Sequence, residues 1–279
     1  MTADKNKIAV ISEIIEGKYE NEEVEIRGWL YNKRSLGSII FLIIRDGSGI
    51  IQATFKKNDI GNEKFKILEK LTRESSLSIY GLVRKDERAV GGYEIVGKDF
   101  NVYHFAEQFP ISKKSHGIEF LLDFRHLWIR SPRQSAILRI RAEVIKACRD
   151  FMEDHGFILV DSPILTPSAC EGTSTLFETD YFGKKAYLSQ SGQLYAEAAA
   201  LALGKVYCFG PTFRAEKSKT RRHLTEFWMI EPEMAFVEFE ENLKIQEEMV
   251  IYIVKRVLEN RKKELEILKR DLEPLKKVE

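Results

Sequence analysis

The feature that most constrains the fold is a series of strand-like segments in the first hundred residues. Three runs rich in β-branched and aromatic residues, 24–34, 37–46 and 49–57, follow one another with short turns between them. The turn at residues 46–49 contains two glycines, which adopt positive φ at no steric cost. A helical stretch at 62–71 and two more strand-like runs, 75–83 and 93–105, complete the series.

Three strands, a helix and two strands is the order of a five-stranded β-barrel of the OB type, which commonly binds oligonucleotides on one face. A small barrel without a nucleic-acid site remains the alternative, because the order of the strands alone names no binding residue. We expect this barrel to occupy residues 1–105. The polar, irregular residues 106–130 are expected to form a linker.

A helical pattern begins at Ser131, a favourable N-cap residue, and Pro132, which suits the first helical position. Apolar residues then recur at helical spacing up to Gly156, namely Ile137, Ile140, Val144, Cys148, Phe151 and Met152. Strand-like runs at 157–169, 184–190, 206–216 and 226–236 surround a helical stretch at 192–203. A long charged amphipathic helix is expected at 240–270, with its apolar side formed by Leu243, Met249, Val250, Ile253, Val254 and Val257. Residues 131–279 therefore predict an α+β domain, with an antiparallel sheet and flanking helices.

Composition limits the classes of protein to consider. The chain is 44% hydrophobic and 31% charged with a formal net charge of +1, so any affinity for nucleic acid has to come from local patches. Cys148, Cys170 and Cys208 are odd in number and lack paired spacing, which favours reduced thiols over a disulfide or zinc framework. No secretory leader and no run of eighteen apolar residues stands out. We therefore expect a cytoplasmic protein without a membrane span.

The stretch FRAEKSKTRRHLTEF, residues 213–227, holds six basic side chains (counting His223) and two acids. Arg214 and Glu216 are two apart, so on a strand they would share one face. A guanidinium rooted on a strand can grip a phosphate with two hydrogen bonds, while cations on the following loop meet the far end of a polyphosphate. Glu216 can accept a hydrogen bond from an amine such as that of adenine. On charge alone, a solvated basic hairpin tip is the simpler alternative.

These residues, followed by MIEPEMAF (229–236), closely resemble motif 2 of the class II aminoacyl-tRNA synthetases in the form carried by the aspartyl and asparaginyl subgroup. GFILVDSPILTPSACEG (156–172) resembles motif 1 of that subgroup and the loop that covers the amino acid. The strand-rich first region resembles its OB-type anticodon-binding domain, so the resemblance covers essentially the whole chain. It implies a class II catalytic domain after the barrel. In the implied reaction, an amino-acid carboxylate attacks the α-phosphate of ATP, and the adenylate is then transferred to tRNA.

The resemblance also implies roles for single residues in the binding of ATP. Arg214 would bridge the substrate carboxylate and the α-phosphate, and is the expected catalytic residue. Glu216 would hold the adenine amine, and Arg222 and His223 would approach the outer phosphates. Pro163 matches the motif 1 proline of the family's dimer interface, which implies a homodimer. A strand-breaking proline without a side-chain function is the alternative for Pro163.

The resemblance further implies which amino acid is bound. Glu171 matches an acid that meets the α-ammonium group, with an ordinary surface acid as the alternative, and Gln193 matches a position that faces the substrate. Aspartyl enzymes of the subgroup place a lysine three residues after that glutamine, where this chain has Ala196. Glu197 matches an acid that the asparaginyl enzymes present to the substrate amide. A carboxylate accepts from that amide and repels aspartate, so asparagine is favoured, with aspartate as the alternative.

In the barrel, Phe41 and Gln52 lie eleven residues apart and match an aromatic residue that stacks on an anticodon base and a glutamine that recognises a base edge. Arg34 matches a nearby cation, and Arg27 lies on the same strand. Stacking tolerates any base, so hydrogen bonds from Gln52 and Arg34 would have to supply specificity. A core aromatic residue is the alternative for Phe41, which lies within IIFLII.

The family also needs a glycine-rich motif 3, with an arginine for the γ-phosphate of ATP and acidic Mg²⁺ ligands just before it. This chain has no glycine after Gly210. We therefore expect motif 3 and the Mg²⁺ ligands to lie outside this chain, with no metal site within it. The expected partners are ATP, asparagine and tRNA, with no DNA and no membrane. The chain is expected to be an N-terminal fragment, a truncated product or half of a split asparagine–tRNA ligase, inactive alone. A non-catalytic tRNA-binding protein derived from a synthetase is the alternative.

Overall fold

The computed structural model describes residues 7–112, 114–167, 176–217, 220 and 222–278. It divides into two compact units, Met1–Asp123 and Phe124–Glu279. Within the residues described, no helix is both long enough and apolar enough to cross a membrane.

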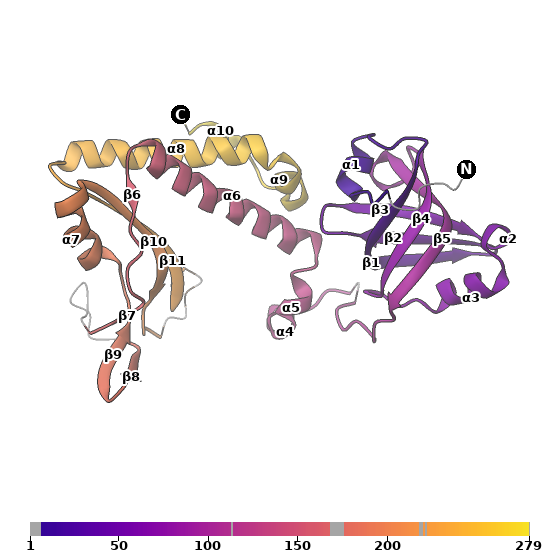
Figure 1. The fold of residues 1–279 in the computed structure, drawn as a ribbon, viewed down its shortest axis with the longest axis horizontal. Helices are drawn as coiled ribbons and strands as arrows, with labels where there is room; N and C mark the ends of the chain where they lie inside the picture. The colour runs from indigo at the N-terminus through magenta and orange to yellow at the C-terminus, as the bar shows by residue number, and fades with distance from the viewer. Residues whose placement is uncertain (1–6, 113, 168–175, 218–219, 221, 279) are drawn as a thin grey trace. The chain divides into compact units, whose positions relative to one another are not determined.

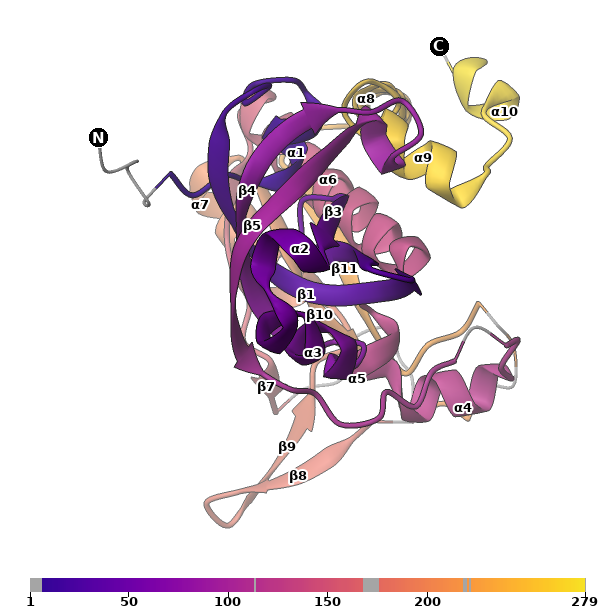
Figure 2. The ribbon, with the colours of Figure 1, turned by 90° about the vertical axis from the view of Figure 1, so that its right-hand side faces the viewer.

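The first unit is built on a closed barrel with the strand order β1-β2-β3-β5-β4 (Figures 1 and 2). Its strands are β1 (Glu23–Leu36), β2 (Ile39–Arg45), β3 (Ile50–Lys56), β4 (Ser76–Lys85) and β5 (Tyr93–His104). The helices are α1 (Ile11–Ile15), α2 (Lys57–Ile60), α3 (Asn62–Lys70) and α4 (Ile118–Asp123), with a 3₁₀ turn, η1 (Val90–Gly92). Strands β3 and β5 pair in parallel, and the other neighbours are antiparallel. The predicted five-stranded OB-type barrel is confirmed.

The barrel core follows from strict alternation along the strands. In β2, Ile40, Leu42 and Ile44 are 0% exposed, while the residues between them are half-buried on the outer face. β3 repeats the pattern with buried Ile51, Ala53 and Phe55. Successive side chains of a strand point to opposite faces, so one face of each strand fills the barrel and the other remains outside.

A β-bulge interrupts this alternation in β1. The register between β1 and β2 shifts between Leu30 and Asn32, so one extra residue, Tyr31, stands on β1. Before the bulge, Arg27 and Trp29 lie on the outer face; after it, Asn32 and Arg34 do.

The second unit contains helices and two small sheets. The helices are α5 (Arg125–Trp128), α6 (Pro132–Asp154), α7 (Gln193–Leu203), α8 (Phe239–Asn260), α9 (Lys262–Leu268) and α10 (Glu273–Lys276). One sheet has the order β11-β10-β6, from β11 (Glu226–Met234), β10 (Lys205–Phe213) and β6 (Ile158–Leu159), with β10 and β11 antiparallel. The other has the order β7-β9-β8, from β7 (Leu165–Thr166), β9 (Lys184–Leu188) and β8 (Glu178–Tyr181), and the β8–β9 hairpin projects from the unit (Figure 1). Residues 106–130, expected to be irregular, contain the short helices α4 and α5.

Helix α6 begins as predicted. The Ser131 hydroxyl accepts a hydrogen bond from the Gln134 amide at 3.4 Å, and Pro132 occupies the first turn. Helices α6 and α8 pack along each other (Figure 1), and their apolar side chains join those of the sheet in one core cluster. That cluster includes Phe151, Met152, Tyr207 and Ile245.

The single helix expected at 240–270 is wrong. Two helices, α8 and α9, meet at Arg261, whose backbone is not helical (φ −125°, ψ 32°). Both residues at the break turn their side chains to the buried Glu143 of α6: Asn260 Nδ2 donates to Oε1 at 3.1 Å and Arg261 Nη2 to Oε2 at 2.6 Å. The break between the two helices thus coincides with two side-chain hydrogen bonds to one buried carboxylate.

Three residues of the predicted apolar stripes are exposed, Ile137 of α6 and Leu243 and Val250 of α8. The buried side of α6 combines the predicted Cys148, Phe151 and Met152 with Ala136, Ala147 and the charged Glu143, which Arg256 also binds. The spacing of apolar residues cannot predict a buried helix face that contains a charged residue held in an ion pair.

Candidate functional site

The basic loop connects β10 and β11. Pairing of the two strands ends at Phe213 and Glu226, and the last backbone bond runs from the Arg214 amide to the Thr225 carbonyl at 2.9 Å. The Arg214 guanidinium carbon lies 5.5 Å from the centre of the Phe227 ring. Glu216 therefore lies in the loop, and the prediction that Arg214 and Glu216 share a strand face was wrong, because the strand ends at Phe213.

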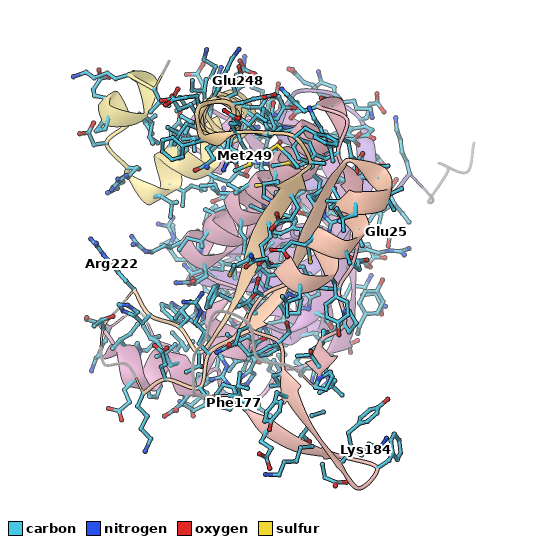
Figure 3. All side chains as sticks on the ribbon, turned by 90° about the vertical axis from the view of Figure 1, so that its left-hand side faces the viewer. Glu25, Phe177, Lys184, Arg222, Glu248 and Met249 are labelled. Atoms are coloured by element: carbon cyan, nitrogen blue, oxygen red, sulfur yellow. The ribbon has the colours of Figure 1, made fainter. Side chains whose placement is uncertain are left out.

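Glu216, Arg222 and His223 are exposed on this loop. Figure 3 shows the Arg222 side chain extending away from the ribbon. The His223 ring forms a hydrogen bond through Nδ1 with the Thr220 hydroxyl. The loop thus presents charged groups to solvent beyond the end of the sheet, next to the half-buried Arg214.

A short segment before α7 packs tightly against the same sheet. The Glu231 carboxylate of β11 accepts hydrogen bonds from the Ser191 hydroxyl and, at 3.0 Å, from the Gly192 amide. A Cβ atom on Gly192 would lie 2.7 Å from Cys208 Sγ and 2.8 Å from Ser162 Oγ, so only glycine fits there. This packing fixes the start of α7, the helix that carries two of the predicted amino-acid-binding residues, Gln193 and Glu197.

Gln193 and Glu197 meet on α7. Gln193 Nε2 donates to Glu197 Oε1 at 2.7 Å, one helical turn apart. Burial, with the charges of Glu197 and Glu231, raises the pKa of the Glu233 carboxyl above its ordinary value. Ala196 is 1% exposed and packs in a small cluster with Ala200 and Val206. The result is a local concentration of negative charge, with Glu231 and Glu233 contributed by the strand that sequence analysis had used only as part of motif 2.

Two of the predicted residues, Glu171 and Pro163, are not part of the arrangements described above. Glu171 lies outside the residues that the structure describes. Pro163 is exposed, as are Ile164 and Leu165 directly after it. These three residues leave a run of apolar surface at and before β7.

The outer face of the barrel brings the predicted RNA-binding residues together. Arg34 is the cross-strand partner of Phe41, and its guanidinium carbon lies 5.0 Å from the centre of that ring. Because Phe41 is on the outer face between buried Ile40 and Leu42, the alternative of a core aromatic residue is excluded. Gln52 follows on β3, and its Nε2 donates to Glu94 Oε2 at 3.2 Å.

Glu94 was missed by the sequence analysis. It is 2% exposed and also accepts from Thr54 Oγ1 at 2.8 Å and from the Arg84 guanidinium. A carboxylate only accepts, so it requires the amide of Gln52 to turn its NH₂ inward. No residue pattern signalled this contact, because the partner lies 42 positions away in the chain.

Arg27 and Trp29 lie on β1 before the bulge. Arg27 Nε donates to Glu25 Oε1 at 2.8 Å. Trp29 is 44% exposed, and the Arg45 guanidinium carbon lies 5.7 Å from its ring centre. The interleaving of aromatic and basic residues in IRGWLYNKR could have signalled Trp29 as a second exposed ring.

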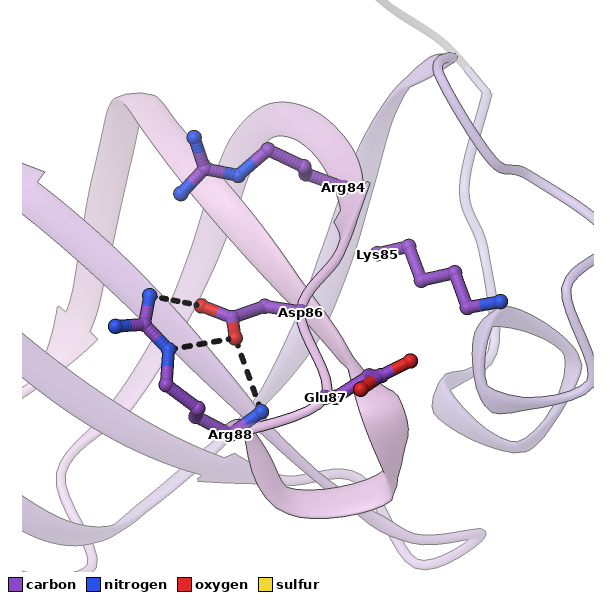
Figure 4. Close-up of a pocket in the computed structure, with 5 residues that line it drawn as sticks. All are labelled: Arg84, Lys85, Asp86, Glu87 and Arg88. Carbon is purple, nitrogen blue, oxygen red and sulfur yellow. Dashed lines mark hydrogen bonds and ion pairs between the residues drawn. The ribbon is translucent and has the colours of Figure 1, made fainter.

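The hairpin between β4 and β5 carries further cations. Residues 84–88 line a shallow hollow, shown in Figure 4. Asp86 accepts from the backbone amide of Arg88 at 3.0 Å and from its Nε and Nη2 atoms. Arg84 and Arg88 extend to one side of the hairpin and Lys85 to the other (Figure 4).

Among the residues described, no group of three or more His, Cys, Asp or Glu side chains is arranged to hold a metal ion. The two oxygens of Glu231 already accept from Ser191 and Gly192.

Both regions of the chain match known protein families. Residues 24–103 match the OB-fold nucleic acid binding domain of the anticodon-binding type, and residues 117–278 match the class II tRNA synthetases (D, K and N). A curated protein of Pelotomaculum thermopropionicum, named asparagine–tRNA ligase, is 62% identical over 91% of this chain and 59% of its own length. A protein of the same name from Desulforamulus reducens is 59% identical over 94% of this chain and 61% of its own length. The chain thus spans about 60% of these relatives.

Solved structures of tRNA synthetases are also similar to this chain. The asparaginyl-tRNA synthetase of Pyrococcus horikoshii, complexed with asparaginyl-adenylate, has a TM-score of 0.90 at 46% identity, covering 94% of this chain and 61% of that one. A putative aspartyl-tRNA synthetase of Leishmania major has a TM-score of 0.84 at 26% identity, covering 95% of this chain and 54% of that one. The family match covers more than half of the chain and includes both the basic loop and α7, so the chain belongs to the class II tRNA synthetases of the D, K and N type.

Proposed function

We propose that this chain is the part of an asparagine–tRNA ligase that binds the anticodon and begins the catalytic domain. Residues 1–105 would bind the anticodon, 106–130 would link the domains, and 131–279 would carry motifs 1 and 2. The observation that carries the choice of asparagine is the pair Gln193–Glu197 on α7, beside a buried alanine at position 196.

Activation requires charge compensation at the α-phosphate of ATP more than it requires an acid or a base. Arg214 is anchored by the last backbone bond of the β10–β11 ladder and by the Phe227 ring, which supports a role in bridging the substrate carboxylate and the α-phosphate. Glu216 would accept from the adenine amine. Arg222 and His223, both exposed, would meet the outer phosphates. When bound, Mg²⁺ would neutralise phosphate charge, with its ligands supplied from outside this chain.

Selection between asparagine and aspartate would depend on charge. Glu197 can accept from the side-chain amide of asparagine, and Gln193 orients it with a hydrogen bond. Glu231 and Glu233 add negative charge nearby. The pKa of Glu233 is raised first by its burial and then by the charges of Glu197 and Glu231. An aspartate side chain would bring a further carboxylate into this region without the lysine that pairs with it in aspartyl enzymes. Glu171 would meet the α-ammonium group.

Recognition of tRNA would occur on the outer face of the barrel. Phe41 would stack on an anticodon base, and Arg34 and Gln52 would bond to base edges. Since Gln52 donates its NH₂ to Glu94, its carbonyl oxygen would be the atom presented to the base. Arg27 would contribute charge on the same strand.

We also propose a cytoplasmic homodimer. The exposed apolar run Pro163–Leu165 supports the dimer. The two cysteines that the structure describes, Cys148 and Cys208, are free thiols, which supports a cytoplasmic location.

The test is amino-acid-dependent exchange of pyrophosphate into ATP by the protein expressed from its whole reading frame. Asparagine should support exchange and aspartate should not. Faster exchange with aspartate would establish the aspartyl alternative instead. Exchange with neither amino acid, together with retained tRNA binding and no glycine-rich segment in the rest of the frame, would favour the non-catalytic tRNA-binding protein.

A further inference from the structure

The bulge in β1 decides which cation faces Phe41. Before it, Trp29 pairs with Arg45; after it, Arg34 pairs with Phe41. In an uninterrupted ladder the register of Trp29 would place Lys33, not Arg34, opposite Phe41. The observed Lys33 instead points the other way, and its ammonium group donates to the carbonyls of Leu68, Glu69 and Leu71 at the end of α3.

Arg73 holds the bulge from outside the ladder. Its Nε donates to the carbonyl of Tyr31, the extra residue, at 3.2 Å. Its Nη1 donates to the Ile111 carbonyl at 3.0 Å, and its guanidinium carbon lies 5.1 Å from the centre of the Phe109 ring. One planar guanidinium thus bridges the bulged strand and a segment that follows β5 by several residues.

The residues around Arg73 reinforce this connection. On one side, the Glu74 amide donates to the Leu30 carbonyl at 2.7 Å, and the Leu30 amide donates to the Ser75 carbonyl at 2.9 Å. On the other side, the Thr72 hydroxyl donates to the Ala106 carbonyl at 2.5 Å, and the Ala106 amide donates to the Ser75 hydroxyl at 3.1 Å. We call residues 72–75 the bulge clamp.

The bulge clamp also carries backbone strain. Glu74 has a φ of 70°, a region that residues other than glycine seldom occupy. Its side chain is buried and paired with Arg45 Nη2 at 2.8 Å. Such strain persists only where surrounding contacts hold it in place, and it often lies near functional surfaces.

We propose that Arg73 is a positioning residue for RNA recognition, which holds the Tyr31 carbonyl and so keeps Arg34 opposite Phe41. This inference rests on the proposed function of the barrel. Lysine is a point charge on a flexible stem, whereas the planar guanidinium of arginine both stacks on a ring and donates in a fixed geometry. If the bulge were lost, Lys33 would replace Arg34 opposite Phe41, and the surface that a base would meet would change.

The test is a double-mutant cycle with the 279-residue chain and a synthetic stem–loop RNA that carries an asparagine anticodon. Arg34→Ala and Arg73→Ala should each weaken binding by roughly tenfold, the loss expected for one charge-assisted hydrogen bond. The double variant should bind no more than about twofold more weakly than either single variant, because Arg73 acts through Arg34. Arg27→Ala is the matched control: Arg27 lies before the bulge, so its effect should multiply with that of Arg73→Ala.

A merely structural role for Arg73 would give a different pattern. In that case Arg73→Ala would lower the midpoint of thermal unfolding and leave the affinity for RNA unchanged, or the losses of affinity from Arg34→Ala and Arg73→Ala would multiply. Either result would overturn the inference. Arg73→Lys, a milder change, retains a donor for Tyr31 and should recover part of the affinity that Arg73→Ala loses; no recovery would count against it. If instead Arg34→Ala and Phe41→Ala bind RNA like the unaltered chain, the proposed function of the barrel fails first.

Discussion

Replacement of Phe41 by alanine separates a binding surface from a core. The ring lies on the outer face of β2, 5.0 Å from the Arg34 guanidinium carbon, while its neighbours Ile40 and Leu42 are 0% exposed. Because the ring adds little to the barrel core, Phe41→Ala should lower the free energy of unfolding by less than about 1 kcal/mol. Leu42→Ala empties part of the core and should lower it by about 2–5 kcal/mol.

RNA binding should show the reverse order of effects. Stacking on an aromatic ring contributes about 1–3 kcal/mol per base, so loss of the Phe41 ring should weaken binding by about 5- to 150-fold. Leu42→Ala, measured well below its unfolding temperature, should leave the outer face in place and change affinity far less.

Two measurements on the same preparations decide the matter. Thermal unfolding followed by circular dichroism reports stability; in a domain of about 100 residues, a loss of 1 kcal/mol shifts the unfolding midpoint by about 4 °C. Fluorescence anisotropy of a labelled anticodon stem–loop reports affinity. If Phe41→Ala destabilises the barrel as much as Leu42→Ala does, or leaves RNA affinity unchanged, the reasoning about the outer face is refuted.

Three further predictions concern the second unit. Burial alone would raise the pKa of Glu143, but hydrogen bonds from Arg256, Asn260 and Arg261 outweigh burial and hold this pKa below its ordinary value of 4.5. The contribution of the Glu143 carboxylate to stability is therefore complete above pH 4.5 and is lost as the pH falls through the lowered pKa. Glu143→Gln should cost about 3–5 kcal/mol in the free energy of unfolding at pH 7 and less than that at pH 3, and an equal cost at both would contradict this. Gly192→Ala, whose Cβ would meet Cys208 Sγ at 2.7 Å, should raise the KM for asparagine in the whole protein; an unchanged KM would mean that this segment does not shape the site. Arg214→Ala should abolish asparagine-dependent exchange while leaving stem–loop binding intact, and retained exchange would remove Arg214 from the mechanism.

Local sequence signals predicted most of the elements. The β-branched and aromatic residues of IIFLII and the neighbouring runs predicted the barrel strands, because such residues are favoured in strands. Ser131 and Pro132 predicted the start of α6, since capping depends on residues within one turn. The OB-type barrel and the class II synthetase family were both identified from the sequence.

The features that escaped prediction depend on contacts between distant residues. The break at Arg261 coincides with a bond to Glu143, 118 residues earlier. Glu94 reaches Gln52 across 42 residues, and Arg73 reaches Tyr31 across 42. Local periodicity carries no information on such pairs. The strand end at Phe213 was also missed, because pairing with β11, not the propensity of the residues, decides where β10 stops.

The central claim, that the chain is part of an asparagine–tRNA ligase, is tested most directly by charging of tRNA. The protein expressed from its whole reading frame is incubated with ATP, Mg²⁺ and tRNA that carries an asparagine anticodon, with either radiolabelled asparagine or radiolabelled aspartate. The account predicts that label from asparagine is attached to this tRNA, with little or none from aspartate. Attachment of aspartate in preference to asparagine would contradict it.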